Sequence, residues 1–311
     1  MMQTRSPAPP APPAPSSPVL ARLAGLLAAH APHDGSFETA IPGVHAIRAE
    51  QASFDLVHGL FQPALCIVAQ GAKMVMLGNQ TFKYDPSRML IFSSELPLAA
   101  MIREASVAAP YLSFRLDFDL ARLSVLIGQV YPDGVPLLAD QRPVYVTGAS
   151  DEIIDAAARL LALAARPDDA ALLAPLITDE IMIRMLRSPM GGRLAQLGRS
   201  ESHRVGKAIA WLRDHFAQPI RVGELAELAH MSPSSLHEHF KSFTSLSPLQ
   251  YQKTLRLQEA RRLMLLRGIS ANVASRRVGY VSASQFSREY ARHFGNTPSG
   301  DLARQRLGEA G

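Results

Sequence analysis

The sequence contains very little cysteine and tryptophan, with one residue of each among 311. The single cysteine, Cys66, excludes an internal disulfide, and few cysteines are typical of proteins in a reducing cytoplasm. Long apolar runs are also lacking, because none approaches the roughly 20 residues that a transmembrane helix needs. These absences predict a cytoplasmic protein that does not cross a membrane.

The N-terminal segment lacks the apolar core of a signal peptide. Residues 1–18 include Arg5, after which proline and alanine dominate as far as Pro15. This composition predicts an extended or disordered tail. We interpret the tail as passive, and the alternative is a ligand for a proline-binding partner.

The net charge of +5 is unevenly distributed along the chain. From Ser200 to Gly311 there are 16 Lys and Arg against 9 Asp and Glu, whereas the preceding residues contain 16 and 18. A basic C-terminal part is suited to contact with the phosphates of nucleic acid. The alternative is a basic surface that is only solvated.

One short pattern occurs twice in this basic part. Residues 222–243 and 271–294 each predict a short helix, a tight turn and a second helix opened by a serine. With an offset of fifty positions, the first opening serine, Ser232, aligns with the second, Ser282. Each second helix has two apolar residues four positions apart, which predict one buried face: Leu236 and Phe240, and Phe286 and Tyr290.

The opposite face of each second helix is polar, as the major groove requires of a recognition helix. Arg288 is suited to a guanine edge or a phosphate, and Glu238 to a cytosine amine. Ser282 with Gln285 three residues later also fits a capping box. We expect DNA contacts from two sets of residues: Ser234, His237, Glu238 and Lys241 in the first helix, and Ser284, Gln285, Ser287 and Arg288 in the second.

A long helix is predicted between the two units, beginning after Ser247 at Pro248 and running to about Arg267. Its apolar residues recur at helical spacing, so one face is expected to be buried. Recognition helices held about 34 Å apart would enter successive major grooves on one face of the DNA. Each monomer is therefore predicted to cover two adjacent grooves of double-stranded DNA.

The middle of the chain predicts a strand-rich domain. Gly78 and Asn79 lie between two strand-like runs, which is a strong hairpin signal. Many short antiparallel strands without intervening helices predict a barrel or a jelly roll. The predicted strands are residues 64–70, 73–77, 80–84, 88–93, 98–102 and 111–116.

Helices are predicted on both sides of these strands along the chain. Their apolar residues recur at helical spacing, and packing onto the barrel is the simplest interpretation. A domain junction is predicted at residues 194–202, after the helix-ending segment from Ser188 to Gly192. The predicted helices are residues 19–30, 120–131, 151–165 and 170–186.

The C-terminal part resembles the DNA-binding domain of AraC/XylS-type transcription regulators over about residues 205–307. Segments that carry the resemblance include Glu224-Leu-Ala226, Ser247-Pro248-Leu-Gln-Tyr251 and Val278-Gly279-Tyr280. Three positions depart from the family pattern: Ser245 replaces a usual glycine, Ser275 takes an alanine-type position, and Gly300 stands where a basic residue is common.

The central part resembles the cupin-like N-terminal domain of one AraC-type subfamily over about residues 41–193. The segments in question are Pro63-Ala-Leu-Cys-Ile-Val-Ala-Gln-Gly71, Lys83-Tyr-Asp85 and Ala109-Pro-Tyr-Leu112. Some members of this subfamily are linked to responses to aldehydes and other small metabolites. The resemblance therefore implies a small-molecule effector.

Together the two resemblances imply an α+β protein with two domains. A cupin-like effector-binding and dimerisation domain is expected over residues 19–195, and an all-α domain with two helix-turn-helix motifs over residues 203–311. The expected partners are double-stranded DNA, the effector, a second copy of the chain bound through the helices, and RNA polymerase. When bound to DNA, the protein would lie in the bacterial nucleoid. The alternative is a DNA-binding regulator whose N-terminal domain only dimerises.

A cupin-like fold also raises the hypothesis of a metal-dependent enzyme. The strand region offers His45 and His58, thirteen positions apart, with no His-x-His pair and no matched glutamate. No Ser-His-Asp or Cys-His-Asn signature is present either. We therefore expect no metal, no cofactor and no catalytic site, and the enzyme is the third alternative.

Cys66 has two interpretations. It is a small buried hydrophobic residue, or it is an electrophile-sensing thiol, which requires exposure to the cavity and a lowered pKa. Strand parity alone does not indicate which face lies inside. The candidate residues for the wall of the effector cavity are Cys66, Met76, Tyr111 and Phe114.

Overall fold

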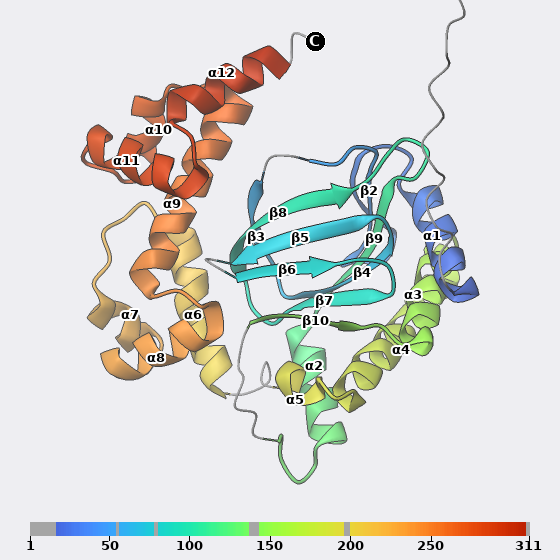
Figure 1. Cartoon of the computed structure of the whole chain (residues 1–311). Coiled ribbons are helices and arrows are strands. Elements are labelled where there is room, and N and C mark those ends of the chain that lie inside the picture. The colour runs from blue at the N-terminus through green and yellow to red at the C-terminus, as the bar shows by residue number, and fades with distance from the viewer. Residues whose placement is uncertain (1–16, 54–55, 78–79, 137–142, 196–199, 309–311) are drawn as a thin grey trace, which may run out of the picture.

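The computed structural model describes residues 17–53, 56–77, 80–136, 143–195 and 200–308. Figure 1 shows an N-terminal part built of strands with helices along one side, and a C-terminal part of helices in two groups joined by one long helix. The proline-rich tail, predicted at 1–18, falls almost wholly outside the described residues, as does the hairpin turn predicted at 78–79.

The N-terminal part contains two antiparallel sheets. The first has the strand order β1-β2-β9-β4-β7-β10, and the second has the order β3-β8-β5-β6. The strands of the first sheet are β1 (Gly35–Glu38), β2 (Val44–Ala49), β4 (Ala64–Gln70), β7 (Arg88–Phe92), β9 (Tyr111–Asp117) and β10 (Val144–Gly148). Those of the second are β3 (Val57–Phe61), β5 (Ala72–Leu77), β6 (Gln80–Tyr84) and β8 (Leu96–Glu104).

Alternation along the strands divides the apolar residues into two buried clusters. On β4, Cys66 belongs to the cluster between the two sheets, which we call the inner cluster, whereas Leu65 and Ile67 belong to the cluster under the helices. β4 is buried on both faces, which explains why its sequence is continuously apolar rather than alternating.

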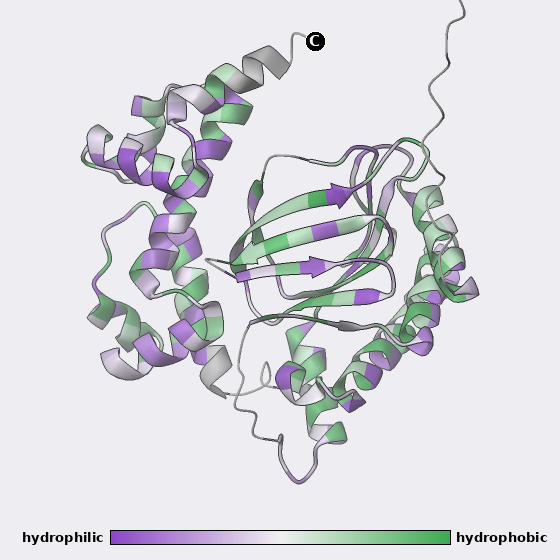
Figure 2. Cartoon of the chain, in the orientation of Figure 1, coloured by the Kyte–Doolittle hydropathy of each residue, from purple (hydrophilic) through white to green (hydrophobic). Residues whose placement is uncertain are grey.

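Helices cover the outer face of the first sheet (Figure 1). Apolar side chains of α1, α3 and α4 form one cluster with those of β2, β4 and β9. In Figure 2 the middle parts of the strands are largely hydrophobic, whereas hydrophilic and hydrophobic residues alternate along the helices. The helices are α1 (Pro18–His30), α2 (Leu120–Val130), α3 (Asp151–Leu163), α4 (Pro167–Arg187) and α5 (Gly191–Ala195).

The C-terminal part consists of two small helical groups, each with its own buried cluster. The 20-residue helix α9 contributes to both clusters and therefore joins them. The first group is α6 (Ser200–His215), α7 (Val222–Leu228) and α8 (Pro233–Thr244), and the second is α10 (Ala271–Arg277), α11 (Ala283–Phe294) and α12 (Pro298–Gly308), with α9 (Pro248–Arg267) between them.

The predicted α+β class is confirmed, and every predicted helix and strand has a counterpart. β4 and α9 have the predicted bounds, and β5 pairs with β6 through Leu77 and Gln80 on either side of the predicted turn. Four strands, β1, β2, β3 and β10, are additional to the prediction. Within the described residues, no helix is long and apolar enough to cross a membrane.

Candidate nucleic-acid interface

The first candidate recognition helix, α8, begins where the sequence predicts and ends one residue later than predicted, at Thr244. The Ser232 hydroxyl accepts a hydrogen bond from the Ser235 amide at 3.2 Å, and proline occupies the first helical turn. Leu236 and Phe240 are fully buried, as predicted. Ser245, which replaces the usual glycine of the family, adopts the left-handed conformation with φ of 60° and ends the helix.

The polar face of α8 points to solvent. Ser234, His237, Glu238 and Lys241, the four predicted contact residues of this helix, are all exposed. A lysine and a histidine flanking a glutamate give this face mixed hydrogen-bonding capacity, which is suited to base edges and phosphates together.

The second candidate recognition helix, α11, departs from the predicted capping arrangement. The Ser282 hydroxyl accepts from the Gln285 amide at 3.2 Å, but the Gln285 side chain donates to Glu289 at 3.3 Å and does not return to the cap. The predicted capping box is therefore wrong here, because Glu289 lies one helical turn away and attracts the amide. A complete capping box occurs instead at Ser247 and Gln250, at the start of α9.

The predicted contact residues of α11 are also exposed. The hydroxyls of Ser284 and Ser287 have local partners, Ser282 at 2.9 Å and the Ala283 carbonyl at 3.0 Å. Arg288 is exposed on this face, and its guanidinium is suited to a base edge or a phosphate.

The two helix-turn-helix units differ by one residue in the turn. The recognition helices are offset by fifty positions, whereas the preceding helices α7 and α10 begin and end 49 positions apart. The Met231 amide donates to the Ala226 carbonyl, and the Tyr280 amide donates equivalently to Ser275. The extra residue is Val281, which is fully exposed. The fifty-residue offset of the opening serines therefore applies to the recognition helices, and the preceding helices are offset by 49 residues.

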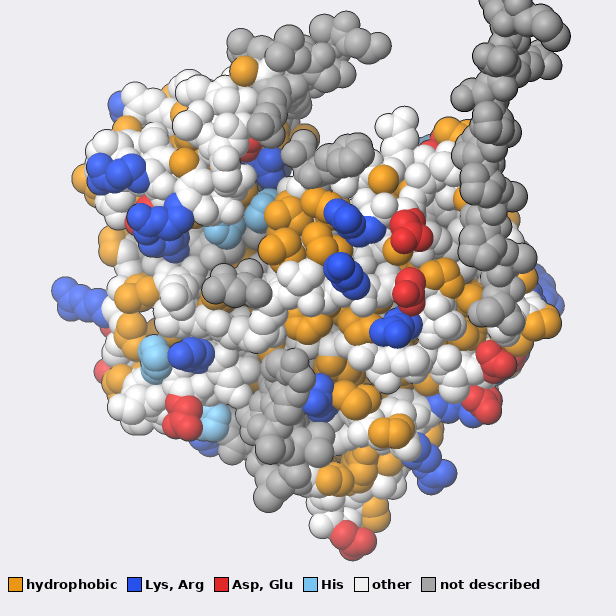
Figure 3. Space-filling model, viewed as in Figure 1, with side chains coloured by type: hydrophobic (Ala, Val, Ile, Leu, Met, Phe, Trp, Pro, Cys, Tyr) orange, Lys and Arg blue, Asp and Glu red, His pale blue; other side chains and the backbone are white. Residues whose placement is uncertain are grey.

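The helix α9 separates the two units. At 1.5 Å per residue, its 20 residues span about 30 Å. In Figure 1 α8 and α11 lie near opposite ends of α9, along the left edge of the molecule. Figure 3 shows Lys and Arg side chains along the same edge of the molecule, with few acidic ones. This arrangement is suited to a negatively charged partner that extends along α9.

The first helical group and the start of α9 contact the two-sheet domain through the loop between β7 and β8. Arg213 of α6 forms an ion pair with Glu95 at 3.0 Å, and the Tyr251 hydroxyl donates to the Glu95 carbonyl at 3.2 Å. The Ser94 hydroxyl donates to the Phe243 carbonyl at 2.9 Å, at the end of α8. Burial raises the pKa of the Glu95 carboxyl, and Arg213 partly offsets this effect.

The second unit contacts β3 through aromatic rings. The His58 ring lies 5.2 Å from that of His293 and 4.6 Å from that of Phe294, both at the end of α11. Arg261 of α9 donates to the Leu56 carbonyl at 3.2 Å. Burial lowers the pKa of His58 to about 3 and that of His293 to about 4, helped by the positive charge of Arg261. Both imidazoles are therefore neutral at physiological pH.

The four predicted residues of the effector cavity do not lie together. Cys66 and Tyr111 belong to the inner cluster, whereas Phe114 packs under the helices on the other face of the first sheet. Met76 alternates on β5 with Val75 and Leu77, which face inward, so it points away from the inner cluster. The assignments of Phe114 and Met76 to a cavity between the sheets are therefore wrong for reasons of strand parity.

Cys66 does not have the features of a reactive thiol. It is 6% exposed, and burial raises the pKa of its thiol to about 11. A thiol with a raised pKa stays protonated and is a poor nucleophile. The structure therefore favours the buried hydrophobic residue over the electrophile-sensing thiol.

Lys73 is a charged residue of this region that the sequence interpretation missed. Its ammonium lies 5.9 Å from the centre of the Tyr111 ring and 6.0 Å from that of Phe61. Burial lowers its pKa, and Arg115 adds a smaller effect in the same direction. Lys73 lies two and four positions before Val75 and Leu77, so alternation places all three on the inner face of β5. This alternation identifies Lys73 only once the inner face of the strand is known.

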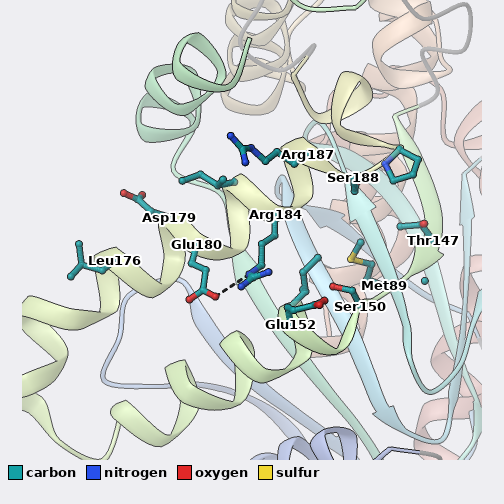
Figure 4. Close-up of a pocket in the computed structure, with 14 residues that line it drawn as sticks. Met89, Thr147, Ser150, Glu152, Leu176, Asp179, Glu180, Arg184, Arg187 and Ser188 are labelled. Atoms are coloured by element: carbon teal, nitrogen blue, oxygen red, sulfur yellow. Dashed lines mark hydrogen bonds and ion pairs between the residues drawn. The ribbon is translucent and has the colours of Figure 1, made fainter. Parts of the chain in front are cut away.

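A separate cleft of about 760 Å³ lies between α3, α4 and the end of β10. Figure 4 shows Glu152, Glu180 and Arg184 lining it, with an ion pair of 2.9 Å between Glu180 and Arg184. Arg159 also pairs with Glu180 at 2.7 Å. Because acidic and basic groups pair with one another, the cleft presents no charge of a single sign.

Metal-ligating side chains do not cluster in the part of the chain that the structure covers, since no three His, Cys, Asp or Glu residues there lie close enough to share an ion. His45 pairs with Asp117 at 3.4 Å, and Arg115 binds the same carboxylate at 2.6 Å. His58 lies at the contact with α11. The two histidines of the strand region thus serve different local structures.

Comparison with known families gives two matches along the chain. Residues 40–193 match the family of AraC-type transcriptional regulator N-termini, and residues 225–304 match a helix-turn-helix domain family. The activator RhaS of Klebsiella pneumoniae is 33% identical over 105 residues, and the regulator YobQ of Bacillus subtilis is 32% identical over 91 residues. Each match covers 38% of the relative and 34% or 29% of this chain, respectively.

Among solved structures, ToxT of Vibrio cholerae is similar over most of the chain. With a bound butenoic acid derivative it aligns with a TM-score of 0.53 and 10% identity, covering 84% of this chain and 98% of that one. ToxT with a bound unsaturated fatty acid aligns with a TM-score of 0.51 and 9% identity, covering 87% and 96%. At this identity the similarity establishes the fold.

A two-sheet domain followed by paired helix-turn-helix units on a connecting helix defines the class of two-domain transcription regulators. The two family matches assign each half of this architecture independently. The chain belongs to the AraC/XylS-type family of transcription regulators.

Proposed function

We propose that this protein is a transcription regulator that binds double-stranded DNA in a sequence-specific manner, with α8 and α11 as its recognition helices. The observation that carries the proposal is the exposure of both polar faces at the two ends of one connecting helix. Contacts to DNA are assigned to His237, Glu238 and Lys241 of α8 and to Gln285 and Arg288 of α11. Ser284 and Ser287 keep local hydrogen bonds and act at most as short-range donors.

Selection from a random-sequence DNA library tests this proposal. Full-length protein should enrich one sequence, with an affinity that falls steeply as salt rises because phosphate contacts release counterions. Arg288→Ala should weaken binding and relax the preference at one position if Arg288 reads a base. Lys241→Ala should weaken all sequences equally and reduce the salt slope by about one. Failure to enrich any sequence would overturn the proposal.

The N-terminal domain is proposed to bind a small acidic molecule between its sheets. An ammonium in apolar surroundings costs free energy unless an anion compensates it, and Lys73 lies among the rings of Tyr111 and Phe61. The two ToxT structures contain carboxylic acids, which agrees with such a ligand. Because Cys66 is buried and protonated, binding is noncovalent, and an effect on DNA affinity requires tighter binding to one conformation than to another.

Thermal unfolding in the presence of oleate tests the effector proposal, with oleyl alcohol as the neutral control. Oleate should raise the melting temperature of the protein, and Lys73→Met should abolish this difference from the alcohol. An equal effect of oleate on the variant would exclude Lys73 as the anion partner.

A homodimer is proposed to form through α4. Leu172 and Leu176 are 76% and 64% exposed, although the same helix buries Ile181, Met185 and Leu186 against the sheet. An apolar stripe outside the core is suited to a second copy of the chain. Sedimentation should give a dimer that Leu176→Lys converts to a monomer. A regulator whose N-terminal domain only dimerises remains the alternative, and oleate without effect on DNA affinity would favour it.

The activity assigned to the protein is regulation and not catalysis. The relatives matched along the chain are transcription regulators. Contact with RNA polymerase and a location in the cytoplasm follow from this role and are part of the proposal.

A further inference from the structure

Arg256 of α9 binds four backbone carbonyls that belong to both helix-turn-helix groups. Its Nε donates to Phe216 at 2.7 Å, and Nη2 donates to Ala217 at 3.2 Å and Gln218 at 3.0 Å. Its Nη1 donates to Gly279 at 3.1 Å. The first three carbonyls lie in the loop between α6 and α7, and the fourth lies in the turn of the second unit.

Gln252, one helical turn earlier, holds the same loop. Its buried side-chain amide donates to the Phe216 carbonyl at 3.0 Å and the Gln218 carbonyl at 2.6 Å. Residues at i and i+4 lie on one face of a helix, so Gln252 and Arg256 act from one side of α9. We call the loop 216–218 with these two side chains the brace.

The loop of the brace packs directly against the turn of the second unit. Gly279 has φ of 86°, and a Cβ built there would lie 1.9 Å from the Ala217 carbonyl oxygen. The Arg256 guanidinium also lies 5.9 Å from the Tyr280 ring, whose hydroxyl donates to Glu289 at 2.8 Å. Lys253 pairs with the same carboxylate at 3.0 Å, which ties α9 to α11. These polar contacts hold the second unit in addition to its covalent link.

We propose that Arg256 is a positioning residue for DNA recognition, which fixes the distance and angle between α8 and α11 and thereby sets the spacing between the two DNA segments that the protein accepts. This inference rests on the proposed function. Arg256 is half-buried, and each of its three nitrogens donates to a carbonyl, so it has no role at the DNA surface. Lysine cannot replace it, because an ammonium lacks the planar fork that reaches carbonyls on two separate segments.

The test uses the DNA sequence that the full-length wild-type protein selects, with one base pair inserted between the two protected segments. The insertion shifts one DNA segment by about 3.4 Å and turns it by about 35°. Two rigidly connected recognition helices cannot follow this change. The measured quantity is the ratio of the dissociation constant for the lengthened DNA to that for the selected DNA. This ratio should be at least about tenfold for the wild-type protein and less than about threefold for Arg256→Ala. Arg256→Lys should behave like Arg256→Ala.

Arg262→Ala is the matched control. Arg262 lies on the same helix, is exposed and binds only Glu259 of that helix among the described residues, so its loss should leave the ratio unchanged. If Arg256→Ala does not fold by circular dichroism, Gln252→Ala removes two bonds to the same loop and should also reduce the ratio. A folded Arg256→Ala or Gln252→Ala protein with the wild-type ratio would overturn the inference, as would a wild-type protein that accepts both spacings equally. Wild-type protein that selects no DNA would instead overturn the proposed function and this inference with it.

Discussion

The two helix-turn-helix units have the same fold, but their turns have different surroundings. The left-handed residue is His230 in the first unit, with φ of 52°, and Gly279 in the second, with φ of 86°. The Ala217 carbonyl approaches Gly279 so closely that no side chain fits there, whereas a histidine is accommodated at the first turn. The second unit is thus docked against the first, and glycine is required only where this docking occurs.

The units also differ in how they contact the N-terminal domain. The first is held by an ion pair and hydrogen bonds around Glu95, and the second by the rings of His58, His293 and Phe294. Changes in pH and substitutions in either set therefore affect the two units differently.

Among single substitutions, Gly279→Ala is expected to have the largest effect. The added Cβ meets the Ala217 carbonyl, and the left-handed conformation disfavours alanine, so the free energy of unfolding should fall by about 3 kcal/mol. Gly295→Ala is the matched control, because Gly295 also has positive φ, 71°, but open space around it, and should cost about 1 kcal/mol. Urea unfolding measures both. Equal losses would show that the close approach to Ala217 does not constrain the second turn.

Acid should weaken the contact of the second unit. The folded protein keeps His58 and His293 neutral, with pKa values of about 3 and about 4, whereas an unfolded histidine has a pKa near 6.5. The unfolded state therefore binds more protons below pH 6.5, and stability falls as pH decreases from about 6.5 towards 4. At pH 5 the loss should be about 2 kcal/mol for each histidine.

Urea unfolding at pH 7.5 and pH 5 measures this dependence. The double variant His58→Phe and His293→Phe retains the ring contacts and should lose most of the difference between the two pH values. An unchanged difference in the double variant would exclude these histidines as its source.

The opening serines should have similar, smaller effects. Ser232→Ala and Ser282→Ala each remove one hydrogen bond to the amide three residues later, so each should cost about 1 kcal/mol in urea unfolding. Ser282→Ala also frees the Ser284 hydroxyl. A cost for Ser282 well above that for Ser232 would indicate that the serine pair stabilises the second unit further.

The smallest effect is expected at the extra residue of the second turn. Val281 is fully exposed, so Val281→Ser should change the free energy of unfolding by less than about 0.5 kcal/mol. Thermal unfolding is sufficient to measure this change. A larger loss would mean that Val281 has a packing partner.

The sequence predicted those elements whose signal is local. The continuous apolar run of β4 and the serine and proline before α9 gave the bounds of both elements. The short strands β1 and β3, with sequences GSFE and VHGLF, contain few alternating apolar residues and were missed. Their pairing with β2 and β8 determines them, and this depends on contacts distant in the sequence.

The residues of the candidate sites were harder to predict from the sequence than the helices and strands. The exposed faces of α8 and α11 follow from helical periodicity, so their residues were identified in advance. The inner face of the sheets was not, because the two apolar faces of a strand cannot be told apart from the sequence alone: Tyr111 and Phe114 lie on opposite faces of β9. The role of Arg256 was also missed, because its partners are backbone carbonyls and have no residue-type signature.

Hydroxyl-radical footprinting of the wild-type protein on its selected DNA tests the central claim most directly, that two recognition helices on one connecting helix read successive major grooves. The account predicts that each monomer protects two patches on one face of the duplex, with centres about 10 base pairs apart. A single protected patch for each monomer, or two patches half a helical turn apart on opposite faces, would contradict it.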